Sequence, residues 1–242
     1  MKCLFCLFSV IYSLQVCSQE TLLADKYEFA SIEYLIEQEI GRIILPQIYQ
    51  NIGIDINVIP LPGQRAQFEA NVGKKDGEIM RIWTYGNENS KSIRVPTPYY
   101  YLETMAFILK DSQISIQQKD DLAKYRLAKV RGVKHTNNIT VGFTDVYDMN
   151  STENMFKMLN QGKVDVVLTN TLDGNLVLKR LGFENIVPIE KPLAVLPLYH
   201  YIYEDHDVLV PLVDKEIIRL IKNGQLEKLL NLAEQKIINK NP

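Results

Sequence analysis

The chain has 242 residues, of which 46% are hydrophobic and 23% are charged, a composition typical of a globular protein with one large domain or two lobes. Its formal net charge of −2 argues against the basic surplus of nucleic-acid-binding proteins and against a polybasic membrane-surface role. We therefore expect no nucleic-acid partner.

The first 18 residues have the pattern of a signal peptide. Lys2 gives a positive start, an apolar run extends from Leu4 to Val16, and the residues that follow favour cleavage before Gln19. Lipid attachment at Cys17 is a rival interpretation, although the bulky Val16 precedes it where lipoprotein signals have a small residue. A buried first helix is the other alternative. We expect a signal peptide over 1–18 and secretion to the periplasm.

Catalytic and metal-binding patterns are absent from the sequence. All three cysteines lie within the first 17 residues, so the mature chain is expected to have no disulfide and no thiolate nucleophile. The three histidines, His135, His200 and His206, lack the spacing of metal ligands. There is no GxSxG, no glycine-rich phosphate loop and no HExxH. We therefore expect no catalytic residue, no metal and no cofactor.

Helix and strand patterns alternate along the first part of the mature chain, which is typical of an α/β protein with a mostly parallel sheet. Isoleucines at helical spacing predict a helix over 33–50, with Pro46 kinking or shortening its last turn. Strands are predicted over 54–58 and 76–82, with a helix over 64–72 between them.

The middle of the chain predicts a second α/β unit between two extended passages that prolines mark. Pro96 and Pro98 precede the first passage, which leads into an apolar strand over 105–109, and Pro192 and Pro197 bracket the second. Between them the patterns predict strands over 127–130, 141–143, 164–170 and 186–189, and helices over 150–162, starting with Asn150 as its cap, and 172–181.

Two amphipathic helices separated by Gly224 are predicted to end the chain. The order of elements implies that the chain leaves lobe I, builds lobe II and returns. We expect lobe I to comprise 19–100 and 197–242, and lobe II to comprise 101–196. A discontinuous domain of this kind has a ligand cleft at its hinge, where strand ends and helix starts meet.

Several local strings, in this order and spacing, resemble those of a known family. They are RVPTPYY at 94–100, GKVDVVLTN at 162–170, the stretch from Leu196 to Lys215 and KNGQLEKLL at 222–230. The chain resembles the type II periplasmic binding proteins, in particular the family 3 solute-binding proteins of polar amino-acid uptake, in a branch of stand-alone secreted receptors. This resemblance implies a two-lobed α/β fold, with a small, mostly parallel sheet flanked by helices in each lobe and a two-segment hinge, and a monomer.

The resemblance also implies ligand-binding positions. Asn89 and Asn170 fall where amino-acid receptors of this type have an arginine for the carboxylate and an aspartate for the ammonium. Both are neutral amides here, which argues against a standard amino-acid ligand because an unpaired buried charge is costly. Met80 and Arg81 fall among the family's ligand contacts. Arg81 is a candidate clamp for a carboxylate or phosphate, and its alternative role is an ion pair with Glu78 or Glu88.

Further candidate ligand contacts come from aromatic residues and from one loop of lobe II. Trp83, Tyr99 and Tyr100 offer flat faces for stacking, with packing in a core or at a rim as their alternative role. Gly132 and Thr136 fall on a loop and helix start where family members bind ligand oxygens.

The function implied is capture of a small polar solute, amino-acid-like or an organic anion, by hinge closure, followed by delivery to a membrane partner. That partner is an ABC permease in an uptake system. A membrane sensor kinase or cyclase is the alternative, and an enzyme on the same fold, of the dehydratase or cell-wall lytic type, is a further one. We expect a binding protein and not an enzyme.

Overall fold

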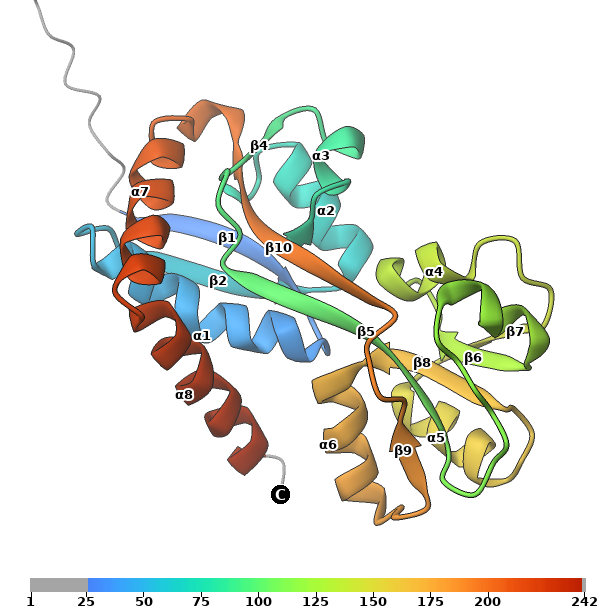
Figure 1. The fold of residues 1–242 in the computed structure, drawn as a ribbon. Coiled ribbons are helices and arrows are strands. Elements are labelled where there is room, and N and C mark those ends of the chain that lie inside the picture. Colours follow the sequence, from blue (N-terminus) through green and yellow to red (C-terminus); the bar gives the residue numbers. More distant parts are fainter. Residues whose placement is uncertain (1–25, 241–242) are drawn as a thin grey trace, which may run out of the picture.

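The computed structural model describes residues 26–240, so the predicted signal peptide lies outside the described residues. Figure 1 shows two lobes joined by two long strands, β5 and β10. The helices are α1 (Ile36–Gln50), α2 (Gly63–Asn71), α3 (Tyr85–Glu88), α4 (Lys134–Thr140), α5 (Thr152–Asn160), α6 (Thr171–Leu181), α7 (Leu209–Lys222) and α8 (Gln225–Lys240), with short 3-10 turns at Lys119–Lys124 and Glu204–His206. The strands are β1 (Tyr27–Ile32), β2 (Ile56–Leu61), β3 (Gly77–Ile82), β4 (Ser92–Arg94), β5 (Tyr100–Leu109), β6 (Leu127–Val130), β7 (Val146–Met149), β8 (Val166–Asn170), β9 (Ile186–Pro188) and β10 (Ala194–Tyr203).

The strands form one continuous, mixed sheet in the order β2-β1-β3-β10-β5-β8-β6-β7. In lobe I, β1 runs parallel to β2 and β3, and β10 joins β3 antiparallel. In lobe II, β6 runs parallel to β7 and β8, and β5 joins β8 antiparallel. Each lobe is thus a small α/β unit whose parallel strands end on the side that faces the other lobe.

The two connecting strands pair with each other and with strands of the two lobes. β5 and β10 pair antiparallel from Tyr100 opposite Leu198 to Thr104 opposite Ala194. Beyond that stretch β5 pairs with β8, and the other end of β10 pairs with β3. The predicted lobe boundaries, between 100 and 101 and between 196 and 197, fall within these two strands. The hinge is therefore a hydrogen-bonded two-stranded ribbon.

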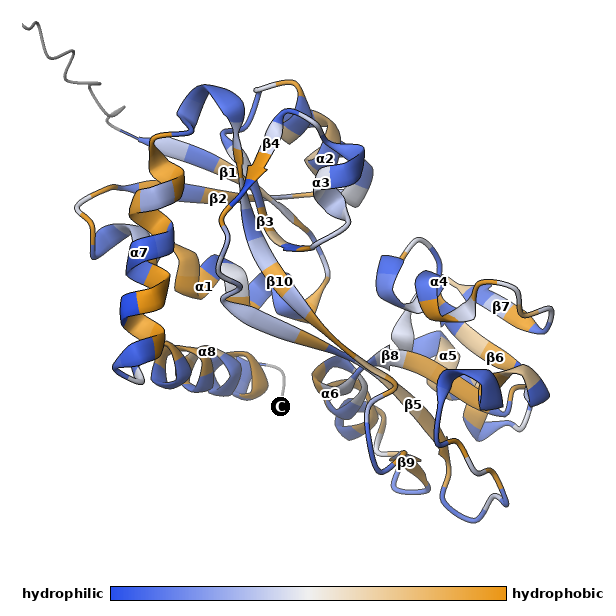
Figure 2. Ribbon diagram, turned by 45° about the horizontal axis from the view of Figure 1, so that its top comes forward, coloured by the Kyte–Doolittle hydropathy of each residue, from blue (hydrophilic) through white to orange (hydrophobic). Residues whose placement is uncertain are grey.

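Each lobe has its own hydrophobic core. In lobe I, α1 packs against the sheet and α7 and α8 pack against α1 and each other, with Phe29, Ile44, Ile79 and Ile217 fully buried in the shared core. In lobe II, α5 and α6 cover one face of the sheet, and Figure 2 shows hydrophobic colour along β5, β6 and β8 between them. Leu176 of α6 belongs to the lobe I core, so the lobes touch beside the hinge.

Two differences from the predicted elements have clear physical causes. Residues 141–143, predicted as a strand, form a turn in which Gly142 has φ of 88°, and the strand is β7 a few residues later. That prediction was wrong because Val141 and Phe143 alternate around a glycine that ends α4. The strand β1 was missed. Glu28 is the one charged residue among its six, but the strand lacks a regular alternation of polar and apolar residues.

Local capping and proline positions shift some element ends. The N-cap of α5 is Ser151, whose hydroxyl accepts from the Asn154 N–H at 3.2 Å, and not the predicted Asn150. Pro60 lies inside β2, which extends past the predicted strand. A proline is tolerated there because β2 is an edge strand, so its missing N–H removes no bond from a central ladder. No helix between residues 26 and 240 has the length and apolar character to cross a membrane.

Candidate ligand-binding site

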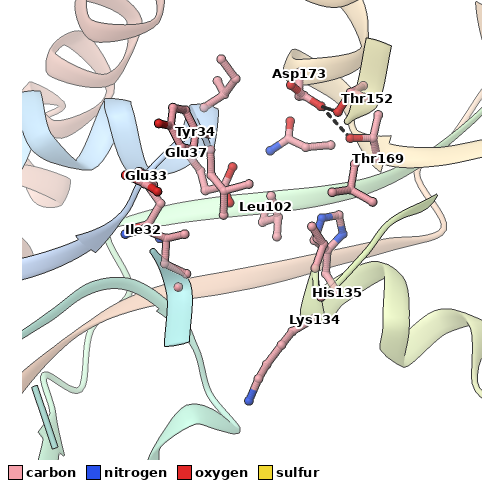
Figure 3. A pocket seen from close by; sticks show the side chains of 18 of the residues that line it. Ile32, Glu33, Tyr34, Glu37, Leu102, Lys134, His135, Thr152, Thr169 and Asp173 are labelled. Carbon is pink, nitrogen blue, oxygen red and sulfur yellow. Dashed lines mark hydrogen bonds between the residues drawn. The ribbon is translucent and has the colours of Figure 1, made fainter. Parts of the chain in front are cut away.

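A cleft of about 1040 Å³ lies between the two lobes. Lobe I lines it with residues that follow or end β1, β2 and β3, and lobe II lines it with residues that follow or end β6, β7 and β8. Figure 3 shows side chains from both lobes converging on this space. Carboxyl ends of parallel strands are where α/β proteins bind ligands, and the cleft has the size of a small-molecule site.

Four of the residues predicted as ligand contacts line this cleft: Met80, Arg81, Gly132 and Asn170. Asn170 also caps α6, since its side-chain oxygen accepts from the Leu172 N–H at 2.8 Å. Gly132 has φ of 80°, in the left-handed region that favours glycine. These positions were visible in the sequence because each ends a predicted strand or follows one.

The other five predicted contacts do not line the cleft, and each has another interaction. Tyr99 accepts from the Met80 N–H at 3.2 Å, and Tyr100 donates to Glu234 at 3.2 Å. The Asn89 amide donates to the Tyr85 carbonyl, and the Thr136 hydroxyl donates to the Val133 carbonyl. Trp83 is half-exposed, with the Arg94 guanidinium over its ring and the Tyr199 ring against it edge to face. Ligand contact by these five stays a prediction without support from their positions.

Arg81 is held on the lobe I side of the cleft. Its guanidinium lies 3.4 Å from the Glu78 carboxylate and 4.6 Å from the centre of the Tyr85 ring, so the ion pair considered from the sequence is present. Burial raises the pKa of Glu78, and the charge of Arg81 acts against that rise. The Nε of Arg81 is buried without a hydrogen-bond partner, but a guanidinium has five N–H donors in all, and Arg81 lines the cleft. Arg81 can therefore be paired and still meet a ligand.

Met80 adopts a backbone conformation that non-glycine residues rarely take, with φ of 49°. Its N–H donates to the Tyr99 hydroxyl, and its carbonyl accepts from Gln38 Nε2 at 3.0 Å. Such strain typically costs about 1–3 kcal/mol and concentrates at functional sites. The buried partners thus fix the end of β3 where it enters the cleft.

Asp173 on α6 is a cleft residue that the sequence analysis did not single out. Thr152 and Thr169 both donate their hydroxyls to its Oδ2, at 2.7 and 2.8 Å, as the dashed lines in Figure 3 show. The two donors come from α5 and β8, so three elements fix the carboxylate. Nothing in the sequence separates Asp173 from an ordinary acidic residue in the first turn of a helix.

Glu37 faces the cleft from lobe I and was also missed. It lies in the first turn of α1, lines the cleft and is only 8% exposed. Burial raises its pKa to about 7; the charge of Asp173 adds to the rise, and Arg81 and Arg42 oppose it. An acidic residue at a helix start is ordinarily a solvated one, so its sequence position gives no sign of this burial.

His135 lines the cleft from the start of α4 as a neutral imidazole. Its Nδ1 lies 2.8 Å from the Thr104 hydroxyl, and burial lowers its pKa to about 4. The ring thus offers a polar, uncharged surface to the cleft at neutral pH.

An ion pair bridges the lobes at the rim of the cleft. The ammonium of Lys134 on α4 contacts the carboxylate of Glu88 on α3, and this hydrogen bond lowers the pKa of Glu88. Both side chains line the cleft. The pair is the charged contact that holds the rims of the two lobes together in this conformation.

Comparisons of the sequence with known proteins give partial matches. No protein-family model matches the chain. An uncharacterized protein of Shewanella oneidensis is 23% identical over 201 residues, which cover 80% of this chain and 75% of that protein. A phosphoribosylaminoimidazole-succinocarboxamide synthase of Bacillus cytotoxicus is 32% identical over 90 residues, 37% of this chain. The match covers only 35% of the synthase, about a third of its length.

Comparisons with solved structures match nearly the whole described chain. A histidine kinase sensor domain with similarity to periplasmic binding proteins has a TM-score of 0.68 at 16% identity, covering 84% of this chain and 93% of that one. The GluR0 ligand-binding core in complex with L-glutamate has a TM-score of 0.69 at 13% identity, covering 87% and 98%. The substrate-binding protein of an amino-acid ABC transporter has a TM-score of 0.63 at 15% identity, covering 85% and 97%. The chain has the two-lobed α/β fold of the type II periplasmic binding proteins.

Proposed function

We propose that this protein is a secreted solute-binding protein that captures a small polar solute between its lobes by hinge closure and delivers it to a membrane protein. The observation that carries the proposal is the cleft of about 1040 Å³, lined from both lobes across a two-stranded hinge. A ligand that contacts both lobes stabilises the closed form, because only that form makes both sets of contacts.

Delivery to an ABC permease is the first candidate for the next step. Among the proteins that share the fold are the substrate-binding protein of an amino-acid ABC transporter and an ancestral arginine-binding protein bound to arginine. A periplasmic location, reached through the signal peptide over 1–18, goes with this role.

Ligand sensing for a membrane kinase is the second candidate. A histidine kinase sensor domain shares the fold over 93% of its own length. In either role the protein binds its solute and releases it unchanged. An enzyme of the same fold would return a product, so chromatography of a bound solute after prolonged incubation separates the two classes.

The test of closure uses the placement of the cysteines. All three lie in the first 17 residues, so protein purified from residue 19 accepts two fluorescent labels at introduced cysteines. Lys74→Cys in lobe I and Glu184→Cys in lobe II are both exposed positions. Solute, identified first by native mass spectrometry of the purified protein, is expected to raise energy transfer between the two labels.

The matched control places both labels on lobe I, at Lys74→Cys and the exposed Glu227→Cys. Energy transfer in this pair is expected to stay constant. A bound solute that changes neither pair would contradict closure. Cross-linking to membrane proteins in the source cells would then identify a permease or a kinase as the partner.

A further inference from the structure

We infer that Glu37 and Asp173 form a subsite for a positively charged group, so that the solute is an organic cation with an amine or guanidinium group. The inference rests on the proposed function and narrows its ligand class. It differs from the anionic ligand that Arg81 suggests from sequence, and it uses neither of the two amide positions, Asn89 and Asn170.

The two carboxylates approach the cleft from opposite lobes. Glu37 starts α1 in lobe I, Asp173 starts α6 in lobe II, and both line the cleft. The charge of Asp173 contributes to the raised pKa of Glu37. A cation between them would contact both lobes at once, which is the arrangement that hinge closure requires.

Asp173 is fixed as an acceptor. The hydroxyls of Thr152 and Thr169 both donate to its Oδ2. Oδ1 receives no bond from any residue between 26 and 240 in this arrangement, and a carboxylate oxygen accepts from ammonium and guanidinium donors.

Glu37 is a buried carboxylate without a partner on another residue. Glu37 is 8% exposed and lines the cleft, and within residues 26–240 the one hydrogen bond to its carboxylate comes from its own backbone. Burying a carboxylate without a partner is costly. A cationic ligand would supply the missing partner.

The charge balance of the cleft points the same way. At or beside the cleft, opposite charges are paired in three ion pairs: Lys134 with Glu88, Arg180 with Glu153 and Arg81 with Glu78. Four lining carboxylates then have no ion-pair partner within residues 26–240: Glu33, Glu37, Glu39 and Asp173. Among the cations that line the cleft in the same part of the chain, Arg131 alone is left. The open charge is negative and favours a cation.

The position of Glu37 predicts how the affinity depends on pH. The charged groups that face it are Asp173 on α6, Arg81 on β3 and Arg42 on its own helix, and the phenol of Tyr100 on β5 is also near, its pKa raised by burial, Glu234 and Glu37. With a pKa of about 7, the ionised fraction of Glu37 at pH 6 is about a tenth of that at pH 8. Affinity for a cation is expected to rise about tenfold from pH 6 to pH 8, and Glu37→Gln is expected to remove this rise.

Calorimetry with four defined probes tests the subsite. L-arginine and 1,4-diaminobutane carry the positive charge, 1,4-butanediol is the neutral counterpart of the diamine, and glutarate is an anion. A cationic probe is expected to bind at least about tenfold more tightly than butanediol and glutarate. Glu37→Gln and Asp173→Asn are each expected to weaken that binding at least about tenfold, whereas the exposed Glu227→Gln and Glu184→Gln are expected to have no effect.

A ligand-free measurement keeps the test decisive if one variant folds poorly. Because Glu37 and Asp173 repel each other, Glu37→Gln is expected to raise the melting temperature of the free protein while it weakens cation binding. Cation binding that both variants leave unchanged would overturn the subsite, and so would preferential binding of glutarate. Closure of the labelled protein around glutarate would leave the proposed function in place, whereas no closure with any solute would contradict the function itself.

Discussion

The end of β3 is the most constrained backbone in the cleft. Met80 has φ of 49°, and the side chain of Met80 packs where a Cβ on Gly41 of α1 would lie. A Cβ built at Gly41 would be 2.7 Å from both Ile79 Cδ1 and Met80 Cγ. The absence of a side chain at this glycine therefore lets α1 approach the strand that presents Met80 and Arg81 to the cleft.

Gly41→Ala is accordingly expected to destabilise the protein by about 1–3 kcal/mol, because overpacking forces neighbouring side chains out of place. Urea denaturation measures this free energy of unfolding. Gly63→Ala is the control: a Cβ there would meet Ile32 at no less than 3.6 Å, and its effect is expected to stay within about 0.5 kcal/mol. Equal effects of the two variants would contradict the role assigned to Gly41.

For single residues, the sequence identifies cleft positions that depend on the residue's own strand. It misses cleft positions that depend on how the other lobe is oriented. Arg81 and Asn170 end strands with clear apolar patterns, so their location in the cleft was predictable. Glu37 and Asp173 begin helices, where acidic residues are common for reasons of the helix dipole alone. Their meeting depends on how the lobes face each other, which no local pattern encodes.

Among the elements, α3 and α4 make the contact that closes the rim. Lys134 and Glu88 pair across the cleft while 37% and 52% of their side chains stay exposed. An exposed pair of this kind contributes about 1 kcal/mol or less, and salt screens it. The contact can therefore shift the equilibrium between open and closed forms, but it is too weak to hold the protein in the closed form by itself.

Lys134→Met is therefore expected to lower solute affinity by no more than about fivefold and to reduce the salt dependence of binding. The reversed pair, Lys134→Glu with Glu88→Lys, is expected to restore part of the affinity. The two-label fluorescence measurement and calorimetry at low and high salt report both effects. Affinity that falls equally in the single and the reversed variants would contradict the rim contact.

Strand and helix content followed from periodicity for most elements, but their ends did not. The long strands β5 and β10 were predicted only in part, because prolines at 96–98 and 192–197 indicated an extended passage without its pairing. The pairing of Tyr100 with Leu198 joins residues almost a hundred positions apart, so tertiary contacts decide it and local sequence does not.

The whole molecule has one sheet but separate cores, which sets how it unfolds. Phe156 is fully buried among lobe II residues such as Phe107 and Val167, whereas Trp83, the single tryptophan, packs in lobe I. Phe156→Ala is expected to destabilise lobe II by about 3–5 kcal/mol and to make it unfold first. Circular dichroism should then show a transition that tryptophan fluorescence does not.

Bound solute is expected to bring the two transitions of this variant together, because a ligand held by both lobes couples their stabilities. Leu220→Ala, in the lobe I core, is the matched control and should shift the fluorescence transition. Coincident transitions in the solute-free Phe156→Ala protein would indicate that the lobes unfold as one unit.

The paired hinge strands limit the motions open to the molecule. Two separate linkers would let one lobe rotate freely relative to the other. Here residues 100–104 of β5 pair antiparallel with residues 194–198 of β10. A ribbon of two bonded strands bends across its thin face far more easily than within its own plane. The lobes should therefore open and close by rotation about one axis, which returns Glu37 and Asp173 to the same alignment at each closure.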